Sequence, residues 1–166
     1  MAKGLIDISE ETRDLVDKIL GETGLANYFN TEVMGILKQK QLVVVKKATE
    51  TTKFLAKKPD TICVYVYEEA FQRLDEKTQD LVMRDALNVI SYDSEKDKIN
   101  IKPKEVSVTL GGLQKYGQEL VNAEEAGAHA IEQLAEEEKE RKRAEAELKK
   151  NKQTTLLIYN SNDNKR

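Results

Sequence analysis

The residues whose type and spacing come closest to a catalytic set lie in Arg84-Asp85-Ala86-Leu87-Asn88. Positions 84 and 88 share one face of a predicted helix, and position 85 follows the first of them. Zinc peptidases use this spacing in H-E-x-x-H, where two histidines hold the metal and the glutamate activates water. Arginine stays protonated and cannot ligate zinc, and asparagine is a poor ligand. We therefore predict no catalytic residue and no metal ligand here. The plain interpretation of these three polar residues is the solvated face of an amphipathic helix, and the alternative is a binding role at the remnant of an active site.

Other candidate sites for metals or cofactors are equally incomplete. His129 is the single histidine of the chain and lies far downstream, where an exposed helical position is expected. The acidic cluster 93–97 could begin a calcium loop, but it lacks the required glycine, and Lys104 stands at its twelfth position. A charged hairpin turn explains the cluster better. The sequence therefore predicts no cofactor.

The elements that position the 84–88 segment are a capped helix and a hairpin. Asp75 caps a helix over about 76–90, residues 92–98 turn the chain, and 99–101 form a strand. Upstream, residues 42–45 and 62–67 are apolar runs of strand length, and 42–45 reads as a strand buried on both faces. A connecting helix at 49–57 predicts a crossover, and therefore parallel pairing of these two strands.

The N-terminal part predicts two helices. Residues 9–20 have Ser9 as a cap, acidic residues in the first turn and Gly21 after the end. Residues 31–39 predict a short helix capped by Thr31. A link or helical turn at 68–74 is expected to be anchored by Phe71.

Composition indicates one domain with a solvated extension. The chain has 166 residues, of which 39% are hydrophobic and 34% charged, and its formal net charge is −3. This charge creates no global attraction to nucleic acid or anionic lipid. The single cysteine, Cys63, lies in an apolar run and is expected to be a buried, inert thiol. No signal peptide or membrane span is evident, so we expect a soluble cytoplasmic protein without membrane contact.

The C-terminal third predicts a long polar helix. Residues 113–134 keep a thin apolar stripe, whereas 132–152 hold equal numbers of acids and bases. Acid-before-base pairs four residues apart stabilise such a helix in water. We therefore expect a compact domain at 1–111, an extended charged helix at 112–152 and a flexible tail at 153–166. The tail carries one apolar patch, formed by Leu156, Leu157, Ile158 and Tyr159.

The order of elements over about 40–102 resembles the phage metallopeptidase family, a small zincin-like group. The matching features are LVVV, TICVYVYEEAF, LDEKTQDLVMRDAL in place of the active-site helix, and ISYDSEKDKINI as a return hairpin. The two histidines of the family motif fall at Arg84 and Asn88, and its glutamate falls at Asp85. The resemblance implies a zincin-like α+β fold and a phage or mobile-element origin, in a degenerate member without peptidase activity.

We therefore predict an α+β fold with a small, partly parallel sheet packed on helices, followed by the long charged helix. The first hypothesis is a non-catalytic interaction protein that contacts a protein partner through Arg84, Asp85, Asn88, the C-terminal helix and the patch at 156–159. The second is a nucleic-acid-associated phage factor, suggested by lysines at 38, 40, 46, 47, 53, 57 and 58, although spacing scatters these over several faces. The third is a virion structural or assembly protein. The sequence specifies neither the partner nor the oligomeric state.

Overall fold

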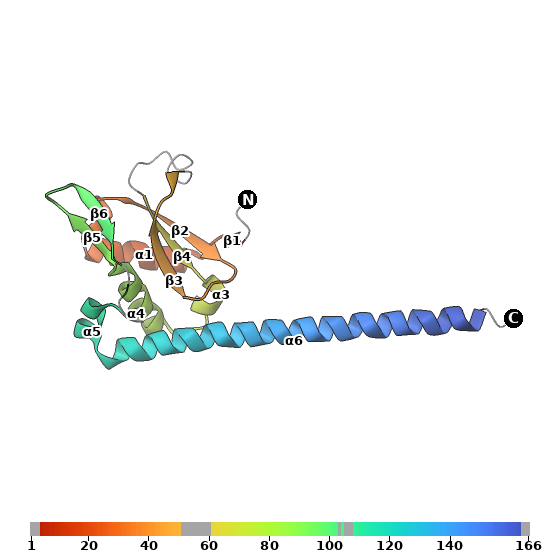
Figure 1. Ribbon diagram of the computed structural model, residues 1–166. Coiled ribbons are helices and arrows are strands. Elements are labelled where there is room, and N and C mark those ends of the chain that lie inside the picture. Colours follow the sequence, from red (N-terminus) through yellow and green to blue (C-terminus); the bar gives the residue numbers. More distant parts are fainter. Residues whose placement is uncertain (1–3, 51–60, 103, 105–107, 164–166) are drawn as a thin grey trace. The chain divides into compact units, whose positions relative to one another are not determined.

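The computed structural model describes residues 4–50, 61–102, 104 and 108–163, the last fourteen of these by their backbone only. Its elements are shown in Figure 1. In chain order they are β1 (Leu5–Ile6), α1 (Glu10–Glu22), η1 (Leu25–Asn27), β2 (Asn30–Ile36), β3 (Val43–Lys47), β4 (Thr61–Val66), α3 (Glu68–Phe71), α4 (Glu76–Leu87), β5 (Ile90–Asp93), β6 (Lys98–Ile101), α5 (Leu110–Tyr116) and α6 (Gln118–Asp163).

The main sheet is mixed and has four strands in the order β1-β2-β4-β3. Strands β2 and β4 are parallel, with Asn30 opposite Thr61, while β1 and β3 are antiparallel to their neighbours. Strands β5 and β6 form a separate antiparallel hairpin. The α+β class and the partly parallel sheet are therefore confirmed.

The prediction of a helix at 31–39 is wrong, because this segment forms strand β2. Val33, Met34, Ile36 and Leu37 fit one face of a helix, yet the chain pairs along its length with β4. The β-branched Thr31, Val33 and Ile36 suit a strand as well. Long-range pairing therefore overrides the local pattern.

The predicted parallel pairing of 42–45 with 62–67 is also wrong. Strand β3 runs antiparallel to β4, and the parallel partner of β4 is β2. Because β3 is an edge strand, Val44 and Val45 are only half-buried, which contradicts burial on both faces. The connecting helix predicted at 49–57 falls almost entirely outside the described residues.

The core lies between the sheet and the helices, and α1 passes behind the sheet in Figure 1. Ile62, Val64 and Val66 alternate along β4 and are at most 1% exposed. The apolar stripe predicted for α1 supplies Val16, Ile19 and Leu20, and Phe71 of α3 is fully buried, as predicted. Burying each such side chain contributes about 1.5–3 kcal/mol. Helix α1, which supplies three of them, also contacts α4. Cys63 is a fully buried thiol, and burial raises its pKa.

Helix α4 and the hairpin follow the predicted order. Asp75 caps α4 by accepting a bond from the Thr78 N–H at 3.0 Å, and bonds from Thr78 lower the pKa of Asp75. The helix ends at Leu87, three residues earlier than predicted, because Ile90–Asp93 forms strand β5 opposite β6. The charged turn at 93–97 is a hairpin turn, as expected.

Two helices make up the C-terminal part, and Gly117 separates them with a φ of 57°. Helix α6 continues to Asp163, although a tail was expected from residue 153. The chain divides into two compact units, residues 1–131 and 132–166. The first includes the start of α6, where a Cβ on Gly127 would collide with Leu42 Cδ1.

Among the described helices, none combines the length and apolarity needed to cross a membrane.

Candidate functional site on the polar face of helix α4

Arg84 makes two ion pairs, one within α4 and one that joins α4 to α1. Its Nε lies 2.6 Å from Asp80 Oδ2, and its Nη1 lies 2.6 Å from Glu22 Oε2. These bonds raise the pKa of Arg84 and lower that of Glu22. With only 18% of its side chain exposed, the guanidinium holds two helices together.

Asp85 is fully buried, at 0% exposure. Its Oδ1 accepts two bonds from Thr109, from the N–H at 2.9 Å and from the hydroxyl at 2.6 Å. Lys104 Nζ lies 2.6 Å from Oδ2, as an ion pair without hydrogen-bond geometry. A solvated helix face was expected here, and for Asp85 that expectation is wrong. Because a buried carboxylate needs such partners, Asp85 ties Lys104 and Thr109 to α4.

Thr109 connects Asp85, Asn88 and the start of α5. Its hydroxyl donates to Asp85 and accepts bonds from Asn88 Nδ2 at 2.8 Å and from the Gly112 N–H at 3.0 Å. A Cβ on Gly112 would collide with Asp85 Oδ1 and with the Thr109 hydroxyl, so the approach requires glycine. Asp85 and Asn88 therefore meet at one hydroxyl, while Arg84 bonds elsewhere.

Lys104 extends the buried cluster to helix α6. Its Nζ lies 3.1 Å from Glu124 Oε1 and bridges this carboxylate to Asp85. Burial raises the pKa of Glu124 despite the opposing attraction of Lys104. Two carboxylates thus share one ammonium group, and the cluster fixes the first turns of α6 against α4.

Replacing Glu124 by glutamine should change how stability depends on pH. Because the folded pKa is raised, the folded state binds this proton more tightly than the unfolded chain does. The wild-type free energy of unfolding therefore falls as pH rises from the ordinary glutamate pKa through the raised value. Across that window Glu124→Gln gains stability relative to wild type. Urea unfolding of both chains in a series of buffers from acidic to neutral pH measures this. The free energy of unfolding of Glu124→Gln minus that of wild type should grow as pH rises, and a constant or shrinking difference would contradict the prediction.

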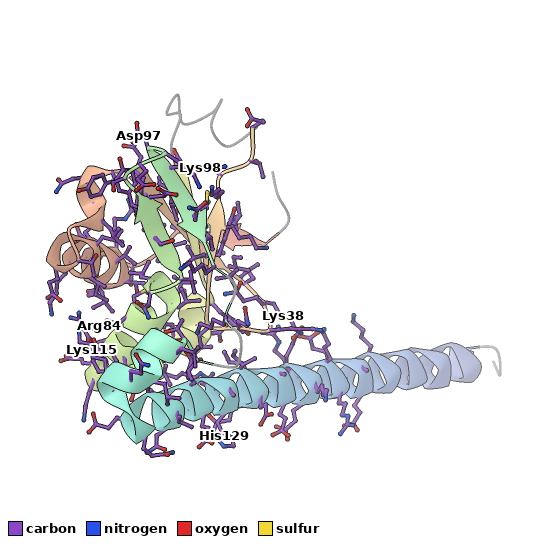
Figure 2. The ribbon with its side chains drawn as sticks, turned by 60° about the vertical axis from the view of Figure 1, so that its left-hand side comes forward. Lys38, Arg84, Asp97, Lys98, Lys115 and His129 are labelled. Atoms are coloured by element: carbon purple, nitrogen blue, oxygen red, sulfur yellow. The ribbon has the colours of Figure 1, made fainter. Side chains whose placement is uncertain are left out.

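Of the cavities that border this face, the one next to Arg84 is small. It has a volume of about 110 Å³ and is lined by Arg84, Asn88, Lys115 and apolar residues of α1 and α4. Figure 2 shows Arg84 and Lys115 on the same side of the first unit. Sites for substrates or cofactors generally occupy about 300–1,000 Å³. The cavity therefore suits a single small group rather than a cofactor.

The remaining candidate residues belong to elements other than α4. The apolar patch lies on α6, and the structure describes only its backbone. This patch consists of Leu156, Leu157, Ile158 and Tyr159. His129 is exposed on α6, as expected. Of the lysines predicted for nucleic-acid binding, Lys46 and Lys47 lie on β3, Lys38 and Lys40 precede it, and the other three fall outside the described residues.

Sequence reasoning missed Lys104, Thr109 and Glu124. The threonine carried a local signal, since it precedes a helix start and caps α5. The lysine and the glutamate carried none, because their contacts depend on the tertiary fold. Among the residues that the structure describes, no group of three or more His, Cys, Asp and Glu side chains is arranged to hold a metal ion.

Comparisons of this chain with models of protein families, with curated proteins and with solved structures found no match.

Proposed function

We propose that this chain is a non-catalytic interaction protein of the cytoplasm, encoded by a phage or mobile element and built on a degenerate metallopeptidase-like domain. It binds a protein partner through its C-terminal helix and the patch Leu156, Leu157, Ile158 and Tyr159. The observation that carries the non-catalytic part is the state of Asp85. The resemblance aligns this residue with a catalytic glutamate, yet its carboxylate is fully buried and bonded to Thr109 and Lys104.

The neighbouring positions support the same assignment. A general base must reach the proton that it abstracts, and a metal ligand must keep a free lone pair. Arg84 is engaged by Asp80 and Glu22, and Asn88 donates to Thr109. These residues therefore maintain the fold around α4. Arg84 and Asn88 also line the small cavity, where a partner can contact them. Asp85 is buried and holds Thr109, to which Asn88 donates.

Helix α6 supports a role in partner binding through its exposed, charged surface. Residues 141–149 are all exposed, and Lys142 Nζ lies 2.7 Å from Glu138 Oε1 one turn away. Such pairs contribute only a few tenths of a kcal/mol each, but together they maintain a helix without a buried face. The apolar residues 156–159 belong to the same helix.

A metal and peptidase assay tests the non-catalytic part. The purified full chain should contain no stoichiometric zinc and should not cleave unfolded protein substrates when zinc is added. The matched control is Asp85→Asn, which should behave identically in this assay. Cleavage by the wild-type chain that Asp85→Asn abolishes would overturn the proposal.

Partner binding through the C-terminal patch is tested by changing Leu156, Leu157, Ile158 and Tyr159 to serine in the full chain. Removing four apolar side chains should weaken binding at least about tenfold, since each buried side chain contributes about 1.5–3 kcal/mol. Quantitative cross-linking in cells measures how much of the partner each variant binds. Leu148→Ser is the matched control, because Leu148 is 61% exposed on the same helix. Equal cross-linking by the two variants would contradict the proposal.

A further inference from the structure

Strand β3 has an outer edge that no other described strand covers. It is the last strand of the sheet and pairs only with β4. The Tyr67 N–H donates to Leu42 C=O at 2.8 Å, and the Ala48 N–H donates to Thr61 C=O at 2.9 Å. Because antiparallel pairing alternates, the intervening Val43, Val45 and Lys47 turn their N–H and C=O groups away from β4.

The strand nearest to this edge is β6, which also turns an unpaired edge outward. The Lys102 N–H donates to Val89 C=O at 2.9 Å, so alternation directs the main-chain groups of Ile99 and Ile101 away from β5. Strand β6, rather than β5, approaches β3. Two open strand edges therefore border the same space.

A cavity of about 320 Å³ lies between the two strands. Val43, Val44 and Val45 line one side, Ile101 and Lys102 line the other, and Ala86 and Val89 also line it. Arg84 and Asn88 border the small cavity described above. Ala86, on α4, and Val89, just after the end of this helix, lie on a different side of the chain. This cavity, called the groove below, is thus distinct from the small cavity, although Lys104 of the Asp85 cluster also lines it. Its lining combines apolar side chains with Gln41 and two lysines, and outward main-chain groups of β3 border it.

The groove is bordered by positive charge. Segments 37–48 and 98–104 contain seven lysines and no aspartate or glutamate. Five of them, Lys40, Lys46, Lys47, Lys98 and Lys102, are exposed, and no carboxylate of the described residues pairs with them. Figure 2 shows Lys98 next to Asp97 at the hairpin end of β6. Lys104, by contrast, is engaged by Asp85 and Glu124. The fold therefore combines two lysine-rich segments that are far apart in sequence.

We propose that this groove binds an acidic segment of a partner protein in extended conformation, which adds as a strand to the edge of β3. Strand addition uses main-chain bonds for affinity and alternate side chains for specificity. Apolar side chains of the segment would face Val43, Val45 and Ile101, and its carboxylates would meet the lysines. This surface goes beyond the proposed function, which uses the C-terminal helix and patch.

An extended peptide fits the groove better than a nucleic acid does. Single-stranded nucleic acids are generally held by aromatic side chains that stack on the bases, together with a basic channel. The lining residues of this cavity are valine, alanine, isoleucine, glutamine and lysine, with no aromatic ring among them. Free strand edges, in addition, are complementary to another peptide backbone.

The test uses the full chain and a fluorescent peptide of alternating glutamate and valine, with a lysine–valine peptide for comparison. Fluorescence anisotropy should show saturable binding of the acidic peptide alone. Lys46→Glu with Lys102→Glu should weaken it by about tenfold or more. The matched control is Lys18→Glu with Lys139→Glu, which makes the same charge change at exposed positions elsewhere and should bind as wild type does.

Val45→Pro separates strand addition from simple charge attraction. Proline removes the outward N–H of residue 45, which is not used in pairing with β4, so it should weaken binding while the lysines remain. Because the lysine variants change only exposed side chains, they keep the proposal testable should Val45→Pro fail to fold. The serine variant at 156–159 should bind the peptide normally, which distinguishes this proposal from the proposed function. Unchanged binding by Lys46→Glu with Lys102→Glu, or displacement of the peptide by a single-stranded oligonucleotide at lower concentration, would overturn it.

Discussion

Replacing Asp85 by alanine should lower the free energy of unfolding by about 3–5 kcal/mol, the usual cost of removing one partner from a buried ion pair. The change removes the acceptor for both Thr109 bonds and one of the two carboxylates, Asp85 and Glu124, that pair with Lys104. Because Thr109 caps α5, the start of that helix should loosen as well. Urea unfolding followed by far-ultraviolet circular dichroism measures the loss.

Two variants make this experiment specific. Glu119→Ala removes a carboxylate that also pairs with a lysine, at 3.1 Å from Lys77, but in solvent. Exposed pairs contribute less than about 1 kcal/mol, so this variant should be nearly as stable as wild type. Asp85→Asn keeps an acceptor for Thr109 without the charge and should lie between the two. Equal losses for Asp85→Ala and Glu119→Ala would show that Asp85 has no special role.

The elements that sequence predicted well are those with local signals. Ser9 and Asp75 each precede a helix, and both side chains cap that helix in the structure. A cap bonds to an N–H three residues away, so a few consecutive residues contain all the information. The apolar runs that form β3 and β4 were equally visible.

Strand order and the fate of 31–39 required long-range information. The segment has apolar residues at helical spacing, and only its parallel partner β4, about thirty residues later, selects the strand. The direction of β3 was predicted from a different signal, the connecting helix expected at 49–57 and the crossover that such a helix implies. Two separate interpretations were therefore wrong, and each concerned pairing between distant segments.

The candidate site shows the same division. The sequence placed Arg84, Asp85 and Asn88 on one helix, but it could not show that Asp85 is buried beneath Lys104 and Thr109. A polar residue on an amphipathic helix reads as solvated unless its partners are known. Lys104 and Thr109 follow Asp85 in the sequence by about twenty residues, and no local pattern around them indicates contact with this carboxylate. Burial of a charge is thus a tertiary property.

Glu68 organises a second buried polar network, at the junction of α1 and α3. Its Oε1 accepts bonds from the Ser9 and Thr12 hydroxyls, from Gln72 Nε2 at 3.0 Å and from the Ser9 N–H at 3.3 Å. Oε2 is buried without a hydrogen-bond partner among the described residues. Since Ser9 also caps α1, one carboxylate oxygen positions the first turn of that helix.

Replacing Glu68 by alanine should therefore lower the free energy of unfolding by about 2–3 kcal/mol, because several buried donors lose a charged acceptor together. Part of this cost is offset, since the unpartnered Oε2 no longer has to be buried, and the loss should be smaller than that of Asp85→Ala. Glu69→Ala is the matched control: it removes the adjacent, exposed carboxylate and should change stability by less than about 0.5 kcal/mol. Chemical denaturation of wild type, Glu68→Ala and Glu69→Ala measures these differences in the free energy of unfolding. If Glu68→Ala were as stable as Glu69→Ala, the bonds to Oε1 would be no better than those that water provides, and the start of α1 would depend on its apolar face alone.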